Sequence, residues 1–143
     1  MFIGEFTHTV DHKGRIALPA KFRARLAEGC VVTRGLDECL FVYSKSEWEK
    51  IAQKIATLPI SQADARAFSR LMLAGAMDLQ IDKQGRIILP GYLREYAQIK
   101  NNVLILGLYN RLEIWDKENW EEYKTRTEEK SNDIAEHLGE LGV

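Results

Sequence analysis

The sequence has few cysteines, no long apolar run and no signal peptide. It contains two cysteines, Cys30 and Cys39, whose spacing matches neither a metal-ligand motif nor a disulfide scaffold. No run of about 18 apolar residues is present that would span a membrane. The N-terminus, MFIGEFTHTVDHKGR, lacks the basic and apolar regions of a signal peptide. These absences predict a soluble, cytoplasmic protein.

The chain also lacks a large excess of charge of either sign. Its 20 basic and 21 acidic residues leave a formal charge of −1. The chain as a whole is therefore neither a strongly basic protein of the kind that coats nucleic acid nor a strongly acidic one. At 143 residues, 45% of them hydrophobic, a domain buries roughly two-thirds of the surface of its unfolded chain. The composition therefore predicts a globular protein whose apolar core is stable without disulfide bonds or a bound metal ion.

The most informative feature that is present is an internal repeat. Residues 11–23 read DHKGRIALPAKFR and residues 82–94 read DKQGRIILPGYLR. They share the Asp, the Gly-Arg-Ile, the Leu-Pro and the final Arg. Further along, GLDECLFVYSKSEWE (35–49) is similar to GLYNRLEIWDKENWE (107–121). The chain is therefore a duplication of a unit of about seventy residues.

Units of this size lie near the lower limit of independent stability. We therefore expect residues 1–78, with an extra helix, and residues 79–143, with an acidic C-terminal helix, to form one pseudo-symmetric unit. Two independent domains are the less favoured alternative, because no Gly/Ser/Pro-rich linker joins the halves.

The same order of elements is expected in both halves, which predicts an α+β fold that is mainly β. A strand, a turn and a second strand lead to a proline that can begin a short helix. Two more strands follow, and then a helix that Ser44, through a capping box, or Asp116 can cap. The expected strands are 5–10, 15–18, 30–33, 39–43, 103–106 and 111–115, and the expected helices are 20–26, 46–57, 61–76 and 91–96, with a tail after 125 that begins as a helix and then frays.

The repeated turns carry the positive charge of the chain. Asp11 and Gly14, like Asp82 and Gly85, occupy the first and fourth positions of a type I turn. Residues 11–25 hold five basic residues and one acidic residue, whereas residues 116–143 hold four basic and nine acidic. Two matching basic turns on one face suit a repetitive polyanion such as double-stranded DNA.

The residue types at the turns suit distinct roles. Arg15 and Arg86 follow the turn glycines, and an arginine can bind guanine O6 and N7 through two hydrogen bonds in the major groove. Lys13 and Lys83 can neutralise phosphates. The aspartates are better suited to stabilising the turns, because a carboxylate repels phosphate and accepts hydrogen bonds from backbone N–H groups.

The doubled D-x-x-x-R motif, the G-R-I-x-L-P segments and the opening MFIGEFTHTVDHKGR resemble the MraZ family of bacterial transcriptional regulators over essentially the whole chain. The resemblance implies a tandem AbrB-like swapped-hairpin barrel with flanking helices. It also implies a nucleoid-associated regulator of the division and cell-wall gene cluster that includes its own gene, acting as a ring-shaped homo-oligomer on repeated promoter boxes. It extends the motif to His12 and Gln84; since Lys13 corresponds to Gln84, the two turns are not electrostatically equal.

Other functional classes have less support in the sequence. We expect no catalytic residues, no metal, no cofactor and no small-molecule substrate, because the chain shows no nucleophile with a base, no complete ligand set and no phosphate loop. The alternative that stays open is a ring-forming scaffold whose basic turns bind an acidic protein partner. Salt-sensitive, sequence-dependent DNA affinity would separate these two possibilities.

Overall fold

The computed structural model describes residues 1–142. The described chain alternates short strands with short helices in the order that the repeat predicts. The strands are β1 (Phe2–Thr9), β2 (Arg15–Ala17), β3 (Cys30–Arg34), β4 (Leu40–Ser44), β5 (Met77–Leu79), β6 (Arg86–Ile88), β7 (Asn102–Tyr109) and β8 (Leu112–Asp116). The helices are η1 (Ala20–Phe22), η2 (Ala24–Leu26), α1 (Lys45–Ala56), α2 (Ala63–Ser69), η3 (Arg70–Ala74), α3 (Gly91–Tyr96), α4 (Lys117–Glu129), α5 (Ser131–His137) and η4 (Gly139–Leu141).

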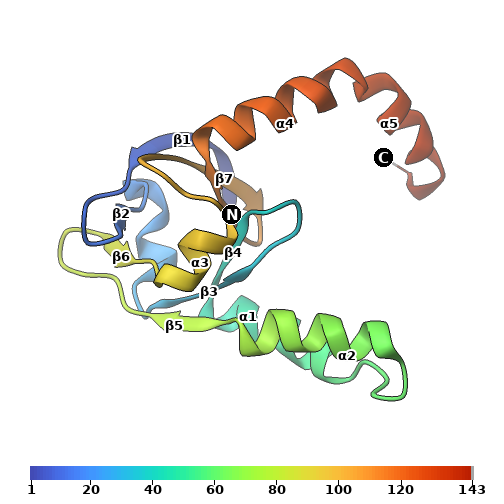
Figure 1. The fold of residues 1–143 in the computed structure, drawn as a ribbon, viewed down its shortest axis with the longest axis horizontal. Coiled ribbons are helices and arrows are strands. Elements are labelled where there is room, and N and C mark those ends of the chain that lie inside the picture. Colours follow the sequence, from blue (N-terminus) through green and yellow to red (C-terminus); the bar gives the residue numbers. More distant parts are fainter. Residues whose placement is uncertain (143) are drawn as a thin grey trace.

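Strands of the two repeats pair with each other throughout the body of the protein (Figure 1). The main sheet is antiparallel, with strand order β1-β7-β8-β4-β3-β5. A second sheet consists of β2 and β6. Each of the four strands before residue 45 therefore pairs with at least one strand after residue 76.

The α+β class is confirmed, whereas the expected swapped-hairpin barrel is not: the structure has no closed barrel. The six-stranded sheet is open, with β1 and β5 at its two edges. The strands β2 and β6 have three residues each and pair with one another, and the one isolated bridge in the described chain, Val10 to Ile16, adds a single contact. These strands are too short to continue the hydrogen-bonding ladder of the main sheet round to closure.

Equivalent residues of the two repeats meet in one apolar core. Ile16 and Ile87 are opposite each other in the β2–β6 pair, and both are fully buried. Phe22 and Leu93, from the short helices that follow Pro19 and Pro90, belong to the same cluster. Burying a side chain of this size contributes roughly 1.5–3 kcal/mol. The repeated G-R-I-x-L-P segments are therefore tied to the centre of the molecule.

Side-chain caps begin the helices that follow β4 and β8, as predicted. The Ser44 hydroxyl accepts a hydrogen bond from the Glu47 N–H, and the Asp116 carboxylate accepts one from the Asn119 N–H, each at 3.3 Å. The helix expected over 61–76 begins later than predicted: α2 begins at Ala63, after Gln62. The Gln62 N–H donates to the carbonyl of Pro59, so Ser61 lies inside a turn.

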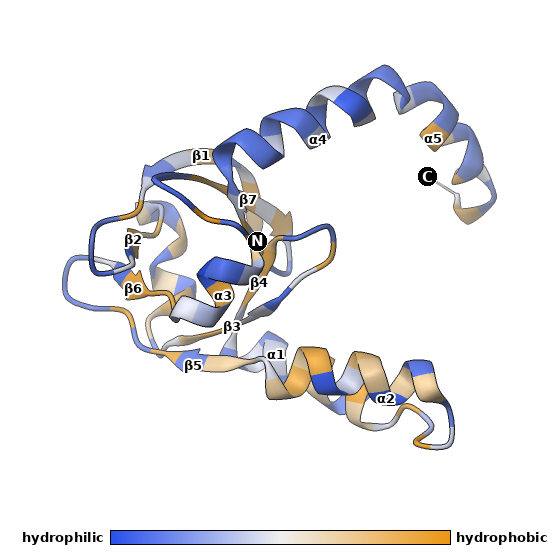
Figure 2. Cartoon of the chain, viewed as in Figure 1, coloured by the Kyte–Doolittle hydropathy of each residue, from blue (hydrophilic) through white to orange (hydrophobic). Residues whose placement is uncertain are grey.

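Two helical arms extend from the body. One is the hairpin of α1, α2 and η3, and the other is α4 followed by α5 (Figure 1). Figure 2 shows that α4 is largely hydrophilic, whereas the hairpin contains many hydrophobic residues. The tail was expected to fray, but residues 131–137 form α5 and residues 139–141 form η4.

Candidate nucleic-acid interface

The turn between β1 and β2 is organised by the Asp11 carboxylate. Its Oδ1 accepts hydrogen bonds from the backbone N–H groups of Lys13 and Arg15, both at 2.9 Å, and its Oδ2 accepts one from the Nε of Arg15. Gly14 donates its N–H to the Asp11 carbonyl and has a φ of +79°, which glycine adopts without strain. One carboxylate therefore shapes the turn and orients the arginine.

The turn between β5 and β6 repeats this geometry. The Asp82 Oδ1 accepts hydrogen bonds from the N–H groups of Gln84 and Arg86, both at 2.9 Å, and Oδ2 accepts one from Arg86 Nε at 2.8 Å. Gly85 has a φ of +76° and donates its N–H to the Asp82 carbonyl. The two D-x-x-G-R segments thus adopt the same local structure.

The β2–β6 pair joins the two turns. The Leu18 N–H donates to the carbonyl of Gly85, and the Leu89 N–H donates to the carbonyl of Gly14, both at 2.9 Å. In Figure 1 both turns project at the left edge of the molecule, on the side away from the two helical arms. The pairing therefore holds the two motifs at fixed positions on one surface.

Each turn glycine is covered by an arginine from the other repeat. A Cβ at Gly85 would lie 2.1 Å from Arg23 Nε, and a Cβ at Gly14 would lie 3.0 Å from Arg94 Nε. The Nε of each arginine also donates to the carbonyl of the residue five positions before it. Arg23 and Arg94 were not predicted to belong to the site, although they are the shared final residue of the repeated segments.

The polar side chains at the tips of the turns are free to meet a ligand. His12, Lys13, Lys83 and Gln84 are exposed. The side chains of Arg15 and Arg86 are 24% and 29% exposed, because their Nε atoms face the aspartates. The motif thus presents an exposed polar tip beside a fixed guanidinium group.

The hydrogen bonds of the turns also determine the ionisation state of the two aspartates. Donation from the Arg15 N–H, followed by that from its side chain, lowers the pKa of Asp11 to about 2, against partial burial, which raises it. The same bonds from Arg86 lower the pKa of Asp82. Both carboxylates are therefore ionised at neutral pH, and each offsets one arginine.

The positive charges of Lys13, Lys83, Arg23 and Arg94 remain in excess. His8 of β1 adds none at neutral pH, because burial and the nearby Arg23 both lower the pKa of its imidazole. The surface around the turns therefore suits an anion.

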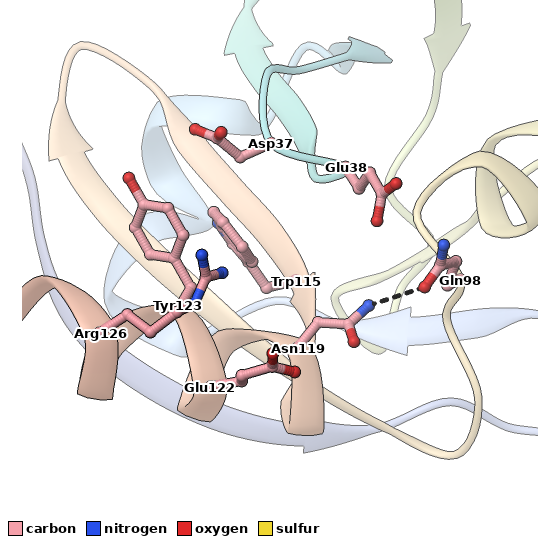
Figure 3. Close-up of a pocket in the computed structure, with 8 residues that line it drawn as sticks. All are labelled: Asp37, Glu38, Gln98, Trp115, Asn119, Glu122, Tyr123 and Arg126. Carbon is pink, nitrogen blue, oxygen red and sulfur yellow. Dashed lines mark hydrogen bonds between the residues drawn. The ribbon is translucent and has the colours of Figure 1, made fainter.

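A cavity of about 490 Å³ lies away from the turns, between the 35–39 loop and α4 (Figure 3). Asp37, Glu38 and Glu122 line it, together with Arg126 and the aromatic rings of Trp115 and Tyr123. Beside it, the side-chain amide of Asn119 donates to the side-chain oxygen of Gln98 at 3.2 Å. Its excess of acidic residues makes it unsuitable for a polyanion.

Neither cysteine presents a thiolate to solvent. Both cysteines are buried, and burial raises the pKa of Cys30 to about 12 and that of Cys39 in the same direction. Their thiols therefore stay protonated at neutral pH. Across residues 1–142, no group of three or more His, Cys, Asp or Glu side chains is placed to hold a metal ion.

None of the helices described is long and apolar enough to cross a membrane.

Comparison with known proteins identifies the family. The family model described as MraZ protein, antitoxin-like, matches this chain twice, over residues 1–71 and 72–139. A protein from Thermoanaerobacter pseudethanolicus named Transcriptional regulator MraZ is 52% identical, and one of the same name from Natranaerobius thermophilus is 48% identical. Both alignments span 143 residues and the full length of both chains. The chain belongs to the MraZ family.

Proposed function

We propose that this protein is a sequence-specific DNA-binding transcriptional regulator whose two D-x-x-G-R turns bind repeated boxes in a promoter. The names of its relatives, Transcriptional regulator MraZ, support a role in the regulation of transcription. The observation that carries the DNA-binding role is the pair of matching basic turns, fixed on one surface by the hydrogen bonds between Gly14 and Leu89 and between Gly85 and Leu18.

In this proposal the arginines bind bases and the lysines bind phosphates. The Asp11 and Asp82 carboxylates hold the Nε atoms of Arg15 and Arg86, which leaves the Nη groups to reach guanine O6 and N7. A two-stranded ribbon fits the major groove, which is about 12 Å wide. An arginine that is already held in place loses less conformational entropy on binding than a free one.

The two turns are proposed to bind different sequences. His12 and Lys13 in the first turn correspond to Lys83 and Gln84 in the second, so the lysine occupies a different position in each tip. Because hydrogen-bonding groups select bases by their position and type, the preferred half-sites would not be identical.

The wider function follows from the family resemblance. We propose that the chain regulates the division and cell-wall gene cluster that includes its own gene, and that it acts in the cytoplasm at the nucleoid. We also propose a pseudo-symmetric swapped-hairpin unit that assembles into a ring-shaped homo-oligomer, presenting several pairs of turns to spaced boxes. A chain of formal charge −1 needs such avidity, because a few phosphate contacts give affinities of only about 10⁻⁴–10⁻⁶ M.

A fluorescence-anisotropy titration tests the proposal. One duplex carries the repeats upstream of the protein's own gene, and a scrambled duplex of equal length and composition is the control, each at two salt concentrations. Tight, repeat-dependent binding that weakens as salt rises is expected. Equal and weak binding to both duplexes would overturn the proposal and favour an acidic protein partner for the turns.

A further inference from the structure

The C-terminal segment carries an apolar stripe that its own chain does not cover. Every residue from 128 to 142 is exposed. Ile134 and Leu138 are each 41% exposed and Leu141 is 74% exposed. Ile134 lies in α5, Leu138 directly follows it and Leu141 ends η4. Their spacing, i, i+4 and i+7, is the one with which an amphipathic helix anchors in an apolar groove.

The opposite arm carries a groove that suits such a helix. A groove of about 380 Å³ lies where the end of α1 and the loop that follows it meet α2 and η3. Leu58, Ile60 and Leu73 supply apolar side chains to it, and Ile60 is one of the most exposed apolar residues of the described chain. Arg66 and Arg70 line it as well. The groove is therefore apolar with a basic edge.

The charges of the two features are complementary. Residues 131–142 contain three acidic residues, Asp133, Glu136 and Glu140, and no lysine or arginine. The hairpin, residues 45–76, contains five basic and three acidic residues. Attraction between an acidic segment and a basic groove edge orients the two before apolar contact forms.

We propose that α5 and η4 of one copy dock into the α1–α2 groove of a second copy of this chain, with Ile134, Leu138 and Leu141 as the apolar anchors. The inference rests on the homo-oligomer of the proposed function, for which it supplies an interface. Because the two surfaces differ, the contact is head-to-tail. A head-to-tail contact closes into a ring when the rotation between copies allows it.

The arrangement of the arms favours a second copy over the same chain. Figure 1 shows α5 and the α1–α2 hairpin at separate corners of the molecule, at the upper right and the lower right of the view. The two turns lie at the left, on the other side of the body. Docking through the arms therefore leaves the turns free, as the proposed function requires.

Sedimentation velocity without DNA tests the interface. Leu138→Asp or Ile60→Asp is expected to weaken self-association by roughly thirtyfold or more, because either change puts a charge into the apolar contact. Leu36→Asp is the matched control: Leu36 is also well exposed but belongs to neither surface, and it should leave the assembly unchanged. Far-UV circular dichroism checks that every variant is folded.

The outcomes separate this inference from the proposed function. If the wild type assembles and both aspartate variants assemble equally well, the interface is wrong and the homo-oligomer stands. If the wild type is monomeric, both the homo-oligomer and the interface fail. The anisotropy titration judges DNA binding independently.

Cross-linking identifies the occupant of the groove. Both native cysteines are buried, so a bismaleimide reagent should link only introduced thiols. In the variant Ile60→Cys/Leu138→Cys, the proposal predicts a ladder of dimers, trimers and larger species. A link within one chain would overturn the proposal in favour of self-docking, and the absence of links would overturn it outright. Ile60→Cys alone, the control, should not form a ladder.

Discussion

The tight contact between Arg23 and Gly85 makes one substitution especially informative. In Gly85→Ala, the new Cβ would lie 2.1 Å from Arg23 Nε, at a φ of +76°. The left-handed backbone costs an alanine about 1–2 kcal/mol. Arg23 must also move away and give up its hydrogen bond to the Leu18 carbonyl, a loss of about 0.5–1.5 kcal/mol. We expect a total destabilisation of about 2–3 kcal/mol.

The equivalent position in the first turn predicts a smaller effect. In Gly14→Ala, the nearest atoms, Cζ and Nε of Arg94, lie 3.0 Å from the new Cβ, so a small side-chain shift relieves the contact. The backbone strain of about 1–2 kcal/mol remains. Gly91→Ala is the control, because its Cβ would meet no atom closer than 3.7 Å and the equivalent residue of the first repeat, Ala20, is already alanine.

Thermal unfolding at one fixed protein concentration measures these differences. At about 3–4 °C per kcal/mol for a chain of this size, Gly85→Ala should lower the Tm by roughly 6–12 °C. Gly14→Ala should have about half that effect, and Gly91→Ala should be neutral or slightly stabilising. Equal losses in Gly14→Ala and Gly85→Ala would refute the idea that Arg23 restrains the second turn more tightly than Arg94 restrains the first.

Further predictions concern the charges and the thiols. Arg15→Ala should cost about 1–3 kcal/mol of DNA affinity and relax specificity at one base pair, as measured by anisotropy on a panel of single-base variants; a uniform loss would make it a phosphate contact. Lys83→Ala should weaken binding to all sequences alike and reduce the salt slope by about 1. Since the pKa of Asp11 is about 2 in the folded protein and its ordinary value is 3.8, the unfolded state binds more protons between these values. The stability that Asp11 confers is therefore complete above about pH 4 and lost as pH falls towards 2; acid titrations of Asp11→Asn should lack this component. Cys30 and Cys39 should react with a thiol reagent only as fast as the protein unfolds, and rapid labelling of the native protein would contradict their burial.

Much of the fold could be predicted because the relevant signals are local. The cap at Ser44 needs only a serine placed three residues before Glu47, and the turn at Asp11 needs only an aspartate and a glycine three residues apart. The repeat then doubled each signal. The caps and turns mark where helices and strands begin and end, so the positions of these elements could be predicted from them.

The features that were missed or wrongly predicted depend on contacts between distant residues. Arg23 reaches Gly85 only because β2 pairs with β6, and no local pattern reveals which strands pair. Barrel closure likewise depends on whether strands as short as β2 continue the main ladder. The tail after residue 125 is rich in polar residues and was expected to begin as a helix and then fray, whereas Ile134, Leu138 and Leu141 give it an apolar stripe that matters only if another surface covers it.

The proposed interface and the proposed DNA contacts together predict how affinity depends on the number of boxes. Leu138→Asp changes a residue on the arm, away from the turns, so its affinity for a duplex with a single box should equal that of the wild type. On a duplex with the full set of boxes, the wild type should bind about 10²–10⁴ times more tightly than the variant, because a linked second contact is effectively intramolecular. A variant that is monomeric in solution yet binds the full promoter as tightly as the wild type would show that the turns of one chain suffice. In that case, a chain of near-neutral charge would not need to assemble in order to bind DNA tightly.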